Sequence, residues 1–373
     1  MAQARNHKHL REILKHLILE PEGFTPEHAA NGLHSIMRGE ASEAQMGGFL
    51  AALKIRGVDR QPQMIAALAQ EMLSSALIPV LETVRKGREE FGIVADIVGT
   101  GGDGWNTFNI STTSSLVAAA AGLQVAKHGS RASSSNCGSA DLLESLGCEL
   151  GTISPPDVAE LISEHRFCFL FASTFHPSMR YLAKTRRDLG FPTPFNVLGP
   201  LTNPVVPTRA VIGVHSKYLG PVMAEALKIL GHTNYAVVCG DENLDEISIA
   251  GATHVWRIQE DGEIKYYTIH PSDFGVPTHP LSDAAGSTLE DNKATLIRLL
   301  SNKLEERDIP IRDFVMVNTG FLLNLCGLAE TLKEGADIAR GTLESGRVLD
   351  LLNNFAKATQ ALKAQEEQKS AQH

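Results

Sequence analysis

The first eighty-five residues place apolar side chains at the spacing of amphipathic helices. Between Leu10 and Ile18, apolar residues recur every three or four positions, a pattern typical of a helix that buries one face. Thr25-Pro26 is a helix-start signal, and Ser42 followed by Gln45 is a capping-box pattern. A fourth helix is predicted from Asp59 to about Leu77. Four helices before any strand predict a small helical domain over residues 1–85.

From Phe91 onward the pattern changes to short apolar runs that alternate with helical stretches. Ile93–Val98 and Phe167–Phe171 are two such runs, and glycines such as Gly122 and Gly147 end the helices between them. Strands separated by helices predict an α/β fold with a mainly parallel central sheet. We therefore expect a larger α/β domain over residues 86–373.

The last third of the chain adds a hairpin and more helices. Trp256–Ile258 and Ile264–Ile269 flank an Asp-Gly turn, which predicts two antiparallel strands. The pattern after Leu289 is helical again. Lys363–His373 is polar, and we expect it to fray.

Composition narrows the class of protein. With 373 residues, 43% of them hydrophobic, the chain can bury a sizeable core. A net charge of -9 argues against nucleic acid or an anionic membrane as a partner. Five scattered cysteines lack metal-binding spacing and fit a reducing compartment. The N-terminus lacks an apolar signal core and no apolar run could span a membrane, so we expect a cytoplasmic protein.

The run from Asp96 to Gly104 reads Asp-Ile-Val-Gly-Thr-Gly-Gly-Asp-Gly and carries the clearest chemical signal. A strand, a glycine loop and a helix start at Asn109 together predict an anion cradle, since glycines expose backbone N–H groups and the helix start adds more. No lysine closes the loop, which excludes the P-loop of nucleotide hydrolases. No third glycine falls in the helix, which excludes the dinucleotide fingerprint. The alternative is a turn that needs glycine for geometry alone.

Two further polar turns follow predicted strands. Lys127–Asn136 carries two cations, a histidine and several hydroxyls, and could hold phosphate oxygens, although capping serines in a surface turn would look similar. Gly240–Ser248 contains clustered carboxylates, which by themselves are typical of a solvated acidic turn. Beside two phosphate-type loops they favour Mg²⁺, which bridges carboxylates to substrate phosphates. The basic stretch Arg180–Arg187 could cover an anionic substrate or be a solvated helix face.

The ordered set of these motifs resembles anthranilate phosphoribosyltransferases. The set comprises the glycine loop, Asn109–Thr112, Lys127-His128-Gly129, His176-Pro177, Phe195–Pro200 and Asp245-Glu246. The resemblance covers nearly the whole chain, up to Gly346. It implies transfer of the phosphoribosyl group from phosphoribosyl pyrophosphate to the amine of anthranilate, with release of pyrophosphate, in tryptophan biosynthesis. It also implies a Mg²⁺ cofactor and a homodimer. In such a fold, later helices near 176–190 would join the N-terminal helical domain in space.

The resemblance carries site residues over to matching positions of this sequence. For phosphoribosyl pyrophosphate it implies Gly99, Thr100, Gly101, Gly102, Asp103, Asn109, Ser111, Thr112, Lys127, Arg131 and Ser135. For anthranilate it implies Gly99, His128, Ser130, His176 and Arg186, of which His128 and Arg186 are the catalytic candidates. For Mg²⁺ it implies Ser111, Asp245 and Glu246. His128 is a candidate general base by position only.

One departure from the family pattern concerns Ser130, where the family commonly has asparagine. A serine offers one hydroxyl in place of an amide, which changes the contacts available to anthranilate.

Two rival functions stay open at this point. A pyrimidine nucleoside phosphorylase would share the architecture, but its lysine-histidine-serine signature is missing from the glycine loop. A non-catalytic paralogue that binds nucleic acid would be expected to lose Asp245-Glu246 and to carry a basic surface.

Overall fold

The computed structural model describes residues 2–81, 92–132 and 137–371. It opens with four helices: α1 (Ala2–Leu19), α2 (Pro26–Met37), α3 (Glu43–Ile55) and α4 (Pro62–Ser74). The predicted caps are confirmed, because the hydroxyls of Thr25 and Ser42 accept the backbone N–H groups of His28 and Gln45. Both cap residues thereby satisfy an N–H that the helix itself leaves unpaired.

The fourth helix is shorter than the predicted span from Asp59 to Leu77. Val58–Arg60 forms a separate 3₁₀ turn, and α4 begins only at Pro62, whose missing N–H suits the first helical position. At the other end, the N–H of Leu77 donates to the carbonyl of Phe175 at 2.8 Å and so leaves the helix. A backbone carbonyl that is distant in the sequence therefore competes for the residues that a local pattern assigned to the helix.

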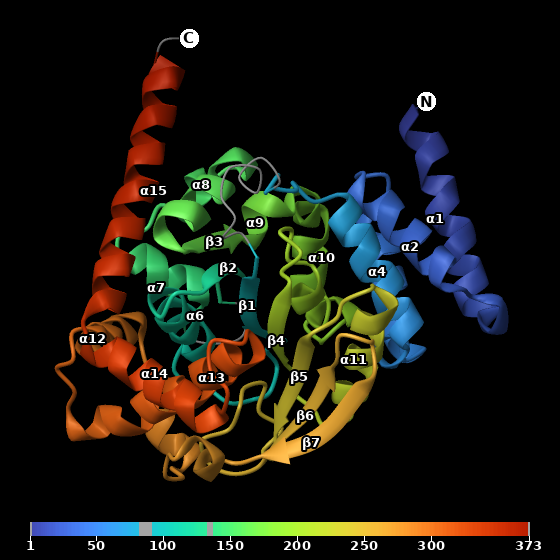
Figure 1. Ribbon diagram of the computed structural model, residues 1–373. Coiled ribbons are helices and arrows are strands. Elements are labelled where there is room, and N and C mark those ends of the chain that lie inside the picture. The colour runs from blue at the N-terminus through green and yellow to red at the C-terminus, as the bar shows by residue number, and fades with distance from the viewer. Residues whose placement is uncertain (1, 82–91, 133–136, 372–373) are drawn as a thin grey trace.

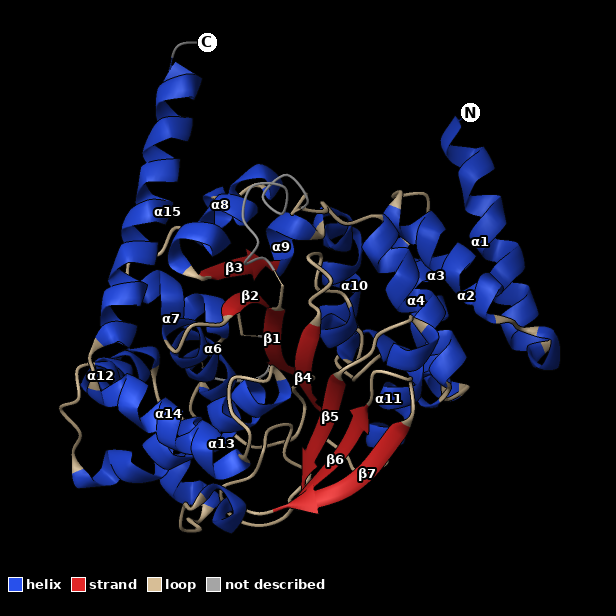
Figure 2. Cartoon of the chain, in the orientation of Figure 1, coloured by secondary structure: helices blue, strands red, loops and turns tan. Residues whose placement is uncertain are grey.

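Seven strands form one sheet in the order β3-β2-β1-β4-β5-β6-β7 (Figure 2). The strands are β1 (Val94–Gly99), β2 (Gln124–Gly129), β3 (Phe167–Phe171), β4 (Arg209–Gly213), β5 (Tyr235–Gly240), β6 (Thr253–Ile258) and β7 (Ile264–Ile269). β3 to β5 pair in parallel, while β6 and β7 form the predicted antiparallel hairpin. The predicted mainly parallel sheet is confirmed. Because β1, β2 and β5 run in the same direction, the three polar turns that follow them emerge at one edge of the sheet.

Helices cover both faces of this sheet. The remaining helices are α6 (Ile110–Ala120), α7 (Ser139–Ser145), α8 (Pro155–His165), α9 (Ala172–Phe175), α10 (Arg180–Leu189), α11 (Leu219–Ile229), α12 (Leu289–Leu300), α13 (Ile309–Leu325), α14 (Leu332–Glu344) and α15 (Arg347–Ala371). One apolar core joins α6, α13 and α14 to the sheet, and a second joins α11 and the N-terminal helices to its other face. The helical bundle is thus packed against the sheet through a shared core.

The basic helix α10 lies against the N-terminal helices although it comes much later in the sequence. Leu182 belongs to the core of the bundle, and the Lys184 ammonium pairs with Glu43 at 2.7 Å. These contacts agree with a later helix joining the bundle. The predicted domain bounds, 1–85 and 86–373, stay a prediction.

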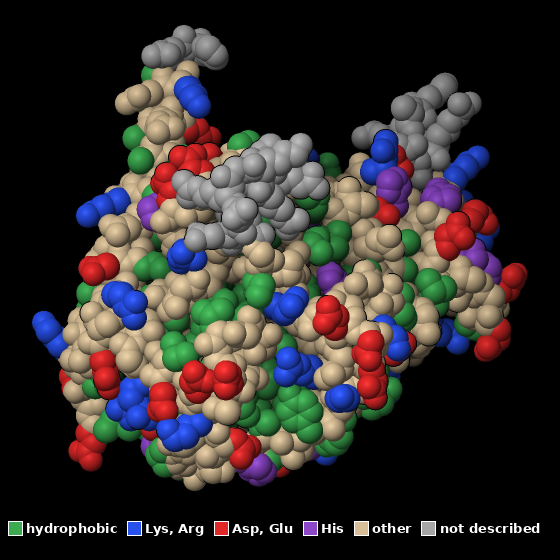
Figure 3. Space-filling model, in the orientation of Figure 1, with side chains coloured by type: hydrophobic (Ala, Val, Ile, Leu, Met, Phe, Trp, Pro, Cys, Tyr) green, Lys and Arg blue, Asp and Glu red, His purple; other side chains and the backbone are tan. Residues whose placement is uncertain are grey.

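The end of the chain corrects the expected fraying. α15 runs as a helix to Ala371 and extends past the body of the molecule (Figure 1). Alanine, lysine, glutamine and glutamate are strong helix formers, and Lys363 is anchored to Glu149 at 3.0 Å. On the face in Figure 3, basic and acidic side chains are interspersed rather than gathered into a basic patch. Within the described part of the chain, no helix is long and apolar enough to cross a membrane.

Candidate active site

The glycine loop after β1 is shaped by close approach and by backbone conformation. A Cβ on Gly99 would lie 2.1 Å from an oxygen of Asp245, so only glycine fits there. Gly101 and Gly102 have φ values of 69° and 81°, in the left-handed region that glycine adopts readily. The loop therefore reaches the acidic turn after β5 with its backbone rather than with side chains.

The acidic pair lies against the N–H donors of the predicted anion cradle. The N–H of Gly101 donates to Asp245 Oδ2 at 2.6 Å. The N–H of Ser111, in the first turn of α6, faces the Glu246 carboxylate and favours its charge. In this structure the chain's own carboxylates therefore sit where phosphate oxygens are expected to bind.

The carboxylates of this cluster disfavour one another's charge. Burial raises the pKa of Asp103 to about 7, with the Asp245 carboxylate as the second cause. Burial also raises the pKa of Asp245, and burial together with Asp245 raises the pKa of Glu246 well above its usual range. Crowded carboxylates of this kind are stabilised by a cation.

The donor chemistry at this point fits Mg²⁺. Two carboxylates and the Ser111 hydroxyl offer oxygen only, which is what Mg²⁺ prefers. The described residues contain no group of three or more histidine, cysteine, aspartate or glutamate side chains arranged to hold a metal. A magnesium ion here would take few ligands from the protein and the others from phosphate and water, which is its usual mode.

Lys127 is buried between the glycine loop and the acidic pair. Its ammonium donates to the Ile97 carbonyl at 2.8 Å and to the Ser111 hydroxyl at 3.3 Å. Burial lowers the pKa of Lys127, whereas the charges of Asp96 and Glu246 raise it. The side chain thus places positive charge beneath the start of α6.

Next to Lys127, the His128 ring lies against the ring of His176, and the two ring centroids are 5.2 Å apart. His128 Nδ1 donates to the Gly199 carbonyl at 3.2 Å, and His176 Nε2 donates to the Thr202 carbonyl at 2.8 Å. Burial lowers the pKa of His176, and burial with the neighbouring His176 lowers the pKa of His128 to about 3. Both rings are therefore neutral at physiological pH, and the buried His128 Nε2 has no partner among the described residues.

Arg186 brings a half-buried cation from α10. Its guanidinium lies 5.8 Å from the centre of the Phe195 ring, and burial lowers its pKa. No carboxylate of the described residues pairs with it, although Lys184, two residues earlier, has such a partner. The arginine can thus receive a carboxylate from a ligand.

Family models match both parts of the chain. The model described as "Glycosyl transferase family, a/b domain" matches residues 92–349, and "Glycosyl transferase family, helical bundle domain" matches residues 11–76. Among curated relatives, the anthranilate phosphoribosyltransferase of Schizosaccharomyces pombe is 42% identical over 90% of this chain and 92% of its own length. That of Lacticaseibacillus paracasei is 41% identical over 91% and 94%.

The chain belongs to the anthranilate phosphoribosyltransferase family. Solved structures of the family agree with its fold. The enzyme of Saccharomyces cerevisiae in complex with PRPP and Mg superposes with a TM-score of 0.84 at 33% identity, covering 94% of this chain and 98% of that one. The enzyme of Thermus thermophilus gives 0.82 at 39% identity, covering 93% and 99%.

Side-chain contacts also join the glycine loop and the second loop of this anthranilate phosphoribosyltransferase family member. The Asn109 amide donates to the Cys137 carbonyl at 2.9 Å, and the Thr112 hydroxyl donates to that of Ser139 at 2.8 Å. The Thr100 hydroxyl lies 3.1 Å from a ring nitrogen of His215. Asn109 and Thr112 thus tie the start of α6 to the chain that follows the second loop, whereas Thr100 contacts the chain that follows β4.

Two described residues of the second loop, Ser130 and Arg131, are not brought to this cluster in the structure. Arg131 forms a bidentate pair with Glu144, with contacts of 2.7 to 3.1 Å, and stacks over Phe171. Ser130 is exposed, and its hydroxyl donates only to the Arg131 carbonyl among the described residues. Ser135 lies outside the described residues. Their assignments to substrate stay predictions.

Sequence reasoning missed three contributors to the site. Asp96 and Asn203 are buried and hydrogen-bonded to each other at 2.9 Å, and the Trp105 indole N–H donates to the Glu242 carbonyl at 3.0 Å. A charged residue in the middle of an apolar strand was a usable signal for Asp96. No local pattern points to the long-range partners of Asn203 or Trp105.

Proposed function

We propose that this protein transfers the phosphoribosyl group of phosphoribosyl pyrophosphate to the amine of anthranilate and releases pyrophosphate, as a step of tryptophan biosynthesis. One observation carries the proposal. Lys127 and His128 are consecutive residues at the end of the same strand. Lys127 faces the anion cradle and its acidic pair, and His128 belongs to the pocket with two neutral histidines. A polyanionic donor and an uncharged amine acceptor could therefore meet at one strand end.

The donor would bind through the glycine loop, its phosphates accepting the N–H groups of Gly101 and Ser111. Thr100, Gly99, Gly102, Asp103, Asn109, Thr112 and Lys127 would complete this half of the site. Since Asp245 occupies the Gly101 N–H, donor binding requires that carboxylate to leave it. Asp245, Glu246 and the Ser111 hydroxyl would hold Mg²⁺. When bound, that ion would neutralise charge on the leaving pyrophosphate.

The acceptor would bind on the other side of Lys127. Arg186 would pair with the anthranilate carboxylate, and the bare Nε2 of His128 would accept an N–H of the amine. Gly99, Ser130 and His176 are the further residues proposed to line this pocket. Held in this way, the amine lone pair can face the sugar, so positioning supplies much of the rate.

The reaction exchanges one bond at C1 of the ribose for another. The bond to the pyrophosphate oxygen breaks with its electron pair, the amine nitrogen forms the new bond from the opposite face, and one amine proton is then lost. With a pKa of about 3, His128 does not hold a proton at neutral pH. We assign it the role of hydrogen-bond acceptor that orients the amine, rather than of a general base.

A homodimer formed through the helical domain and a cytoplasmic location remain part of this proposal. The decisive experiment incubates the purified protein with anthranilate, phosphoribosyl pyrophosphate and Mg²⁺. We expect loss of anthranilate fluorescence and one equivalent each of pyrophosphate and the N-phosphoribosyl product. Phosphate-dependent cleavage of thymidine, or tight DNA binding without turnover, would contradict the proposal.

A further inference from the structure

One short segment, Gly199–Asn203, holds both histidines of the amine pocket. The carbonyl of Gly199 accepts from His128, and the carbonyl of Thr202 accepts from His176. Because a carbonyl can only accept, the Gly199 contact fixes His128 as the Nδ1–H tautomer, and the Thr202 contact at 2.8 Å favours the Nε2–H tautomer of His176, whose ring also faces the Met72 backbone. The position of this segment therefore decides which ring nitrogens are left to a ligand.

Asn203 attaches that segment to the sheet. Its Nδ2 donates to Asp96 Oδ2 on β1 at 2.9 Å and to the Ala126 carbonyl on β2 at 2.8 Å. Its Oδ1 accepts the N–H of Val205 at 3.0 Å and so closes the turn. The amide thus bridges two strands at the residue that precedes Lys127 and His128.

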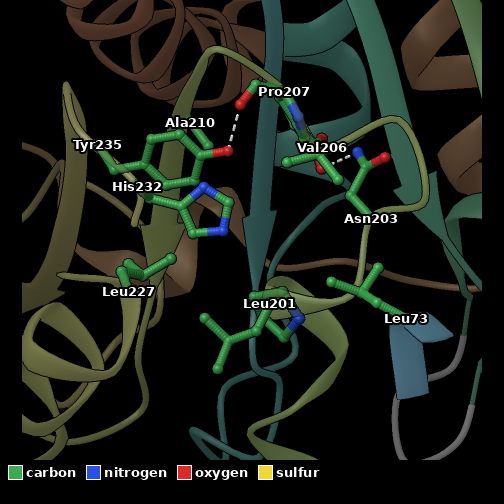
Figure 4. Close-up of a pocket in the computed structure, with 11 residues that line it drawn as sticks. Leu73, Leu201, Asn203, Val206, Pro207, Ala210, Leu227, His232 and Tyr235 are labelled. Atoms are coloured by element: carbon green, nitrogen blue, oxygen red, sulfur yellow. Dashed lines mark hydrogen bonds between the residues drawn. The ribbon is translucent and has the colours of Figure 1, made fainter. Parts of the chain in front are cut away.

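Asp96 is the buried partner that fixes this amide. Its side chain is 1% exposed, and its Oδ1 makes no hydrogen bond within the described residues. Together with Asn203, it borders a small cavity lined by apolar side chains from α4 and α11, such as Leu73 and Leu227 (Figure 4). The Asn203 amide is the one side-chain hydrogen bond that Asp96 makes among the described residues. The Lys127 charge and the backbone N–H groups of His128 and Ile97 also favour the charged Asp96 carboxylate.

We propose that Asp96 and Asn203 are positioning residues that set the orientation of His128 and His176 in the amine pocket, acting through the Gly199–Asn203 segment. Neither residue touches substrate. The proposal rests on the proposed function, in which these histidines receive anthranilate. According to this proposal, the buried pair contributes to specificity for the acceptor. The glycine loop forms the donor site.

The test compares Asp96→Ala, Asn203→Ala and Asp96→Asn in the full-length protein. We expect both alanine variants to raise KM for anthranilate about tenfold. Asn203→Ala keeps the Asp96 charge that faces Lys127, so it should leave KM for phosphoribosyl pyrophosphate within about twofold. Asp96→Asn keeps an oxygen that can accept from Asn203, so it should restore KM for anthranilate close to the wild-type value. Asp308→Asn is the matched control, because Asp308 is equally buried but pairs with Arg298 far from the pocket.

A second measurement reads the histidines without any substrate. In ¹⁵N-histidine NMR spectra, assigned with His128→Gln and His176→Gln, the alanine variants should lose the two fixed tautomer patterns while Asp96→Asn keeps them. Unchanged patterns in Asp96→Ala and Asn203→Ala, or equal rises of KM for both substrates in Asn203→Ala, would overturn the proposal. Absence of turnover in the wild-type protein would instead refute the proposed function, and the NMR result would still decide the role of this pair.

Discussion

The phosphate half and the amine half of the site are built in opposite ways. In the phosphate half, the ligand-binding N–H of Gly101 is already bonded to a carboxylate of the same chain, and the acidic groups around it raise one another's pKa. In the amine half, two neutral rings are held by backbone carbonyls from one segment. The first half must rearrange when its ligand binds, whereas the second is already set.

This difference follows from the charge of the ligands. A polyanion and a divalent cation can displace internal contacts, since they bring strong electrostatic interactions of their own. An uncharged amine offers only weak hydrogen bonds and depends on groups that are oriented beforehand. The predictions below test each half separately.

Removal of the acidic pair should have the largest effect. Asp245→Ala and Glu246→Ala are expected to reduce kcat/KM by about 10²–10³-fold, because charge on the departing pyrophosphate would lose its counter-cation. Circular dichroism and thermal melting should remain close to wild type, since the mutual repulsion of the carboxylates is relieved. Steady-state kinetics across a magnesium titration measures the effect. Wild-type kinetics in both variants would refute the metal assignment.

Asp96→Asn tests the amine half of the site through the free energy of unfolding. Burial raises the pKa of Asp96 to about 6 from its ordinary 3.8, so the charged form costs the folded state about 3 kcal/mol above pH 6 and nothing below pH 3.8. The variant should therefore be more stable than wild type at pH 8, and this advantage should vanish as the pH falls from 6 towards 4. Urea unfolding at several pH values checks the trend. A less stable variant at pH 8 would contradict it.

Arg186→Ala should affect the acceptor alone. Loss of a charge-assisted bond to a carboxylate is expected to raise KM for anthranilate about tenfold to thirtyfold, with little change for the donor. Arg187→Ala is the matched control, because Arg187 follows Arg186 on the same helix but is exposed. Comparable KM values for anthranilate in the two variants would remove Arg186 from the site.

The smallest expected effect concerns inorganic pyrophosphate without magnesium. Because Asp245 competes for the Gly101 N–H, Asp245→Asn should bind pyrophosphate several-fold tighter than wild type in the presence of a chelator. Asp241→Asn removes the same charge from the same turn without touching the glycine loop, since Asp241 bonds His254. If calorimetry shows the same gain in pyrophosphate affinity for both variants, the loss of negative charge alone explains it. Asp245 would then not block the cradle.

The sequence predicted the parts of the molecule that depend on local pattern. The caps at Thr25 and Ser42, the hairpin and the mainly parallel sheet were all visible in the spacing of residues. The end of α4 was not, because a backbone bond from Leu77 to Phe175 decides it.

The same contrast holds for the candidate site. A glycine loop and a pair of carboxylates, each directly after a predicted strand, together indicate a phosphate and metal site in the sequence, although neither does so alone. The orientation of the histidines depends on carbonyls more than twenty residues away, as for His176 and Thr202, and no local pattern encodes it. Arg131 carried the right charge for phosphate, but the structure pairs it with Glu144.

The account rests on a donor site that opens when its own carboxylate leaves. A crystal structure with phosphoribosyl pyrophosphate and Mg²⁺ tests this most directly. We expect pyrophosphate oxygens to accept the N–H groups of Gly101 and Ser111, with Asp245 turned from Gly101 towards the metal. A donor bound elsewhere, with the bond between Gly101 and Asp245 intact, would contradict the account.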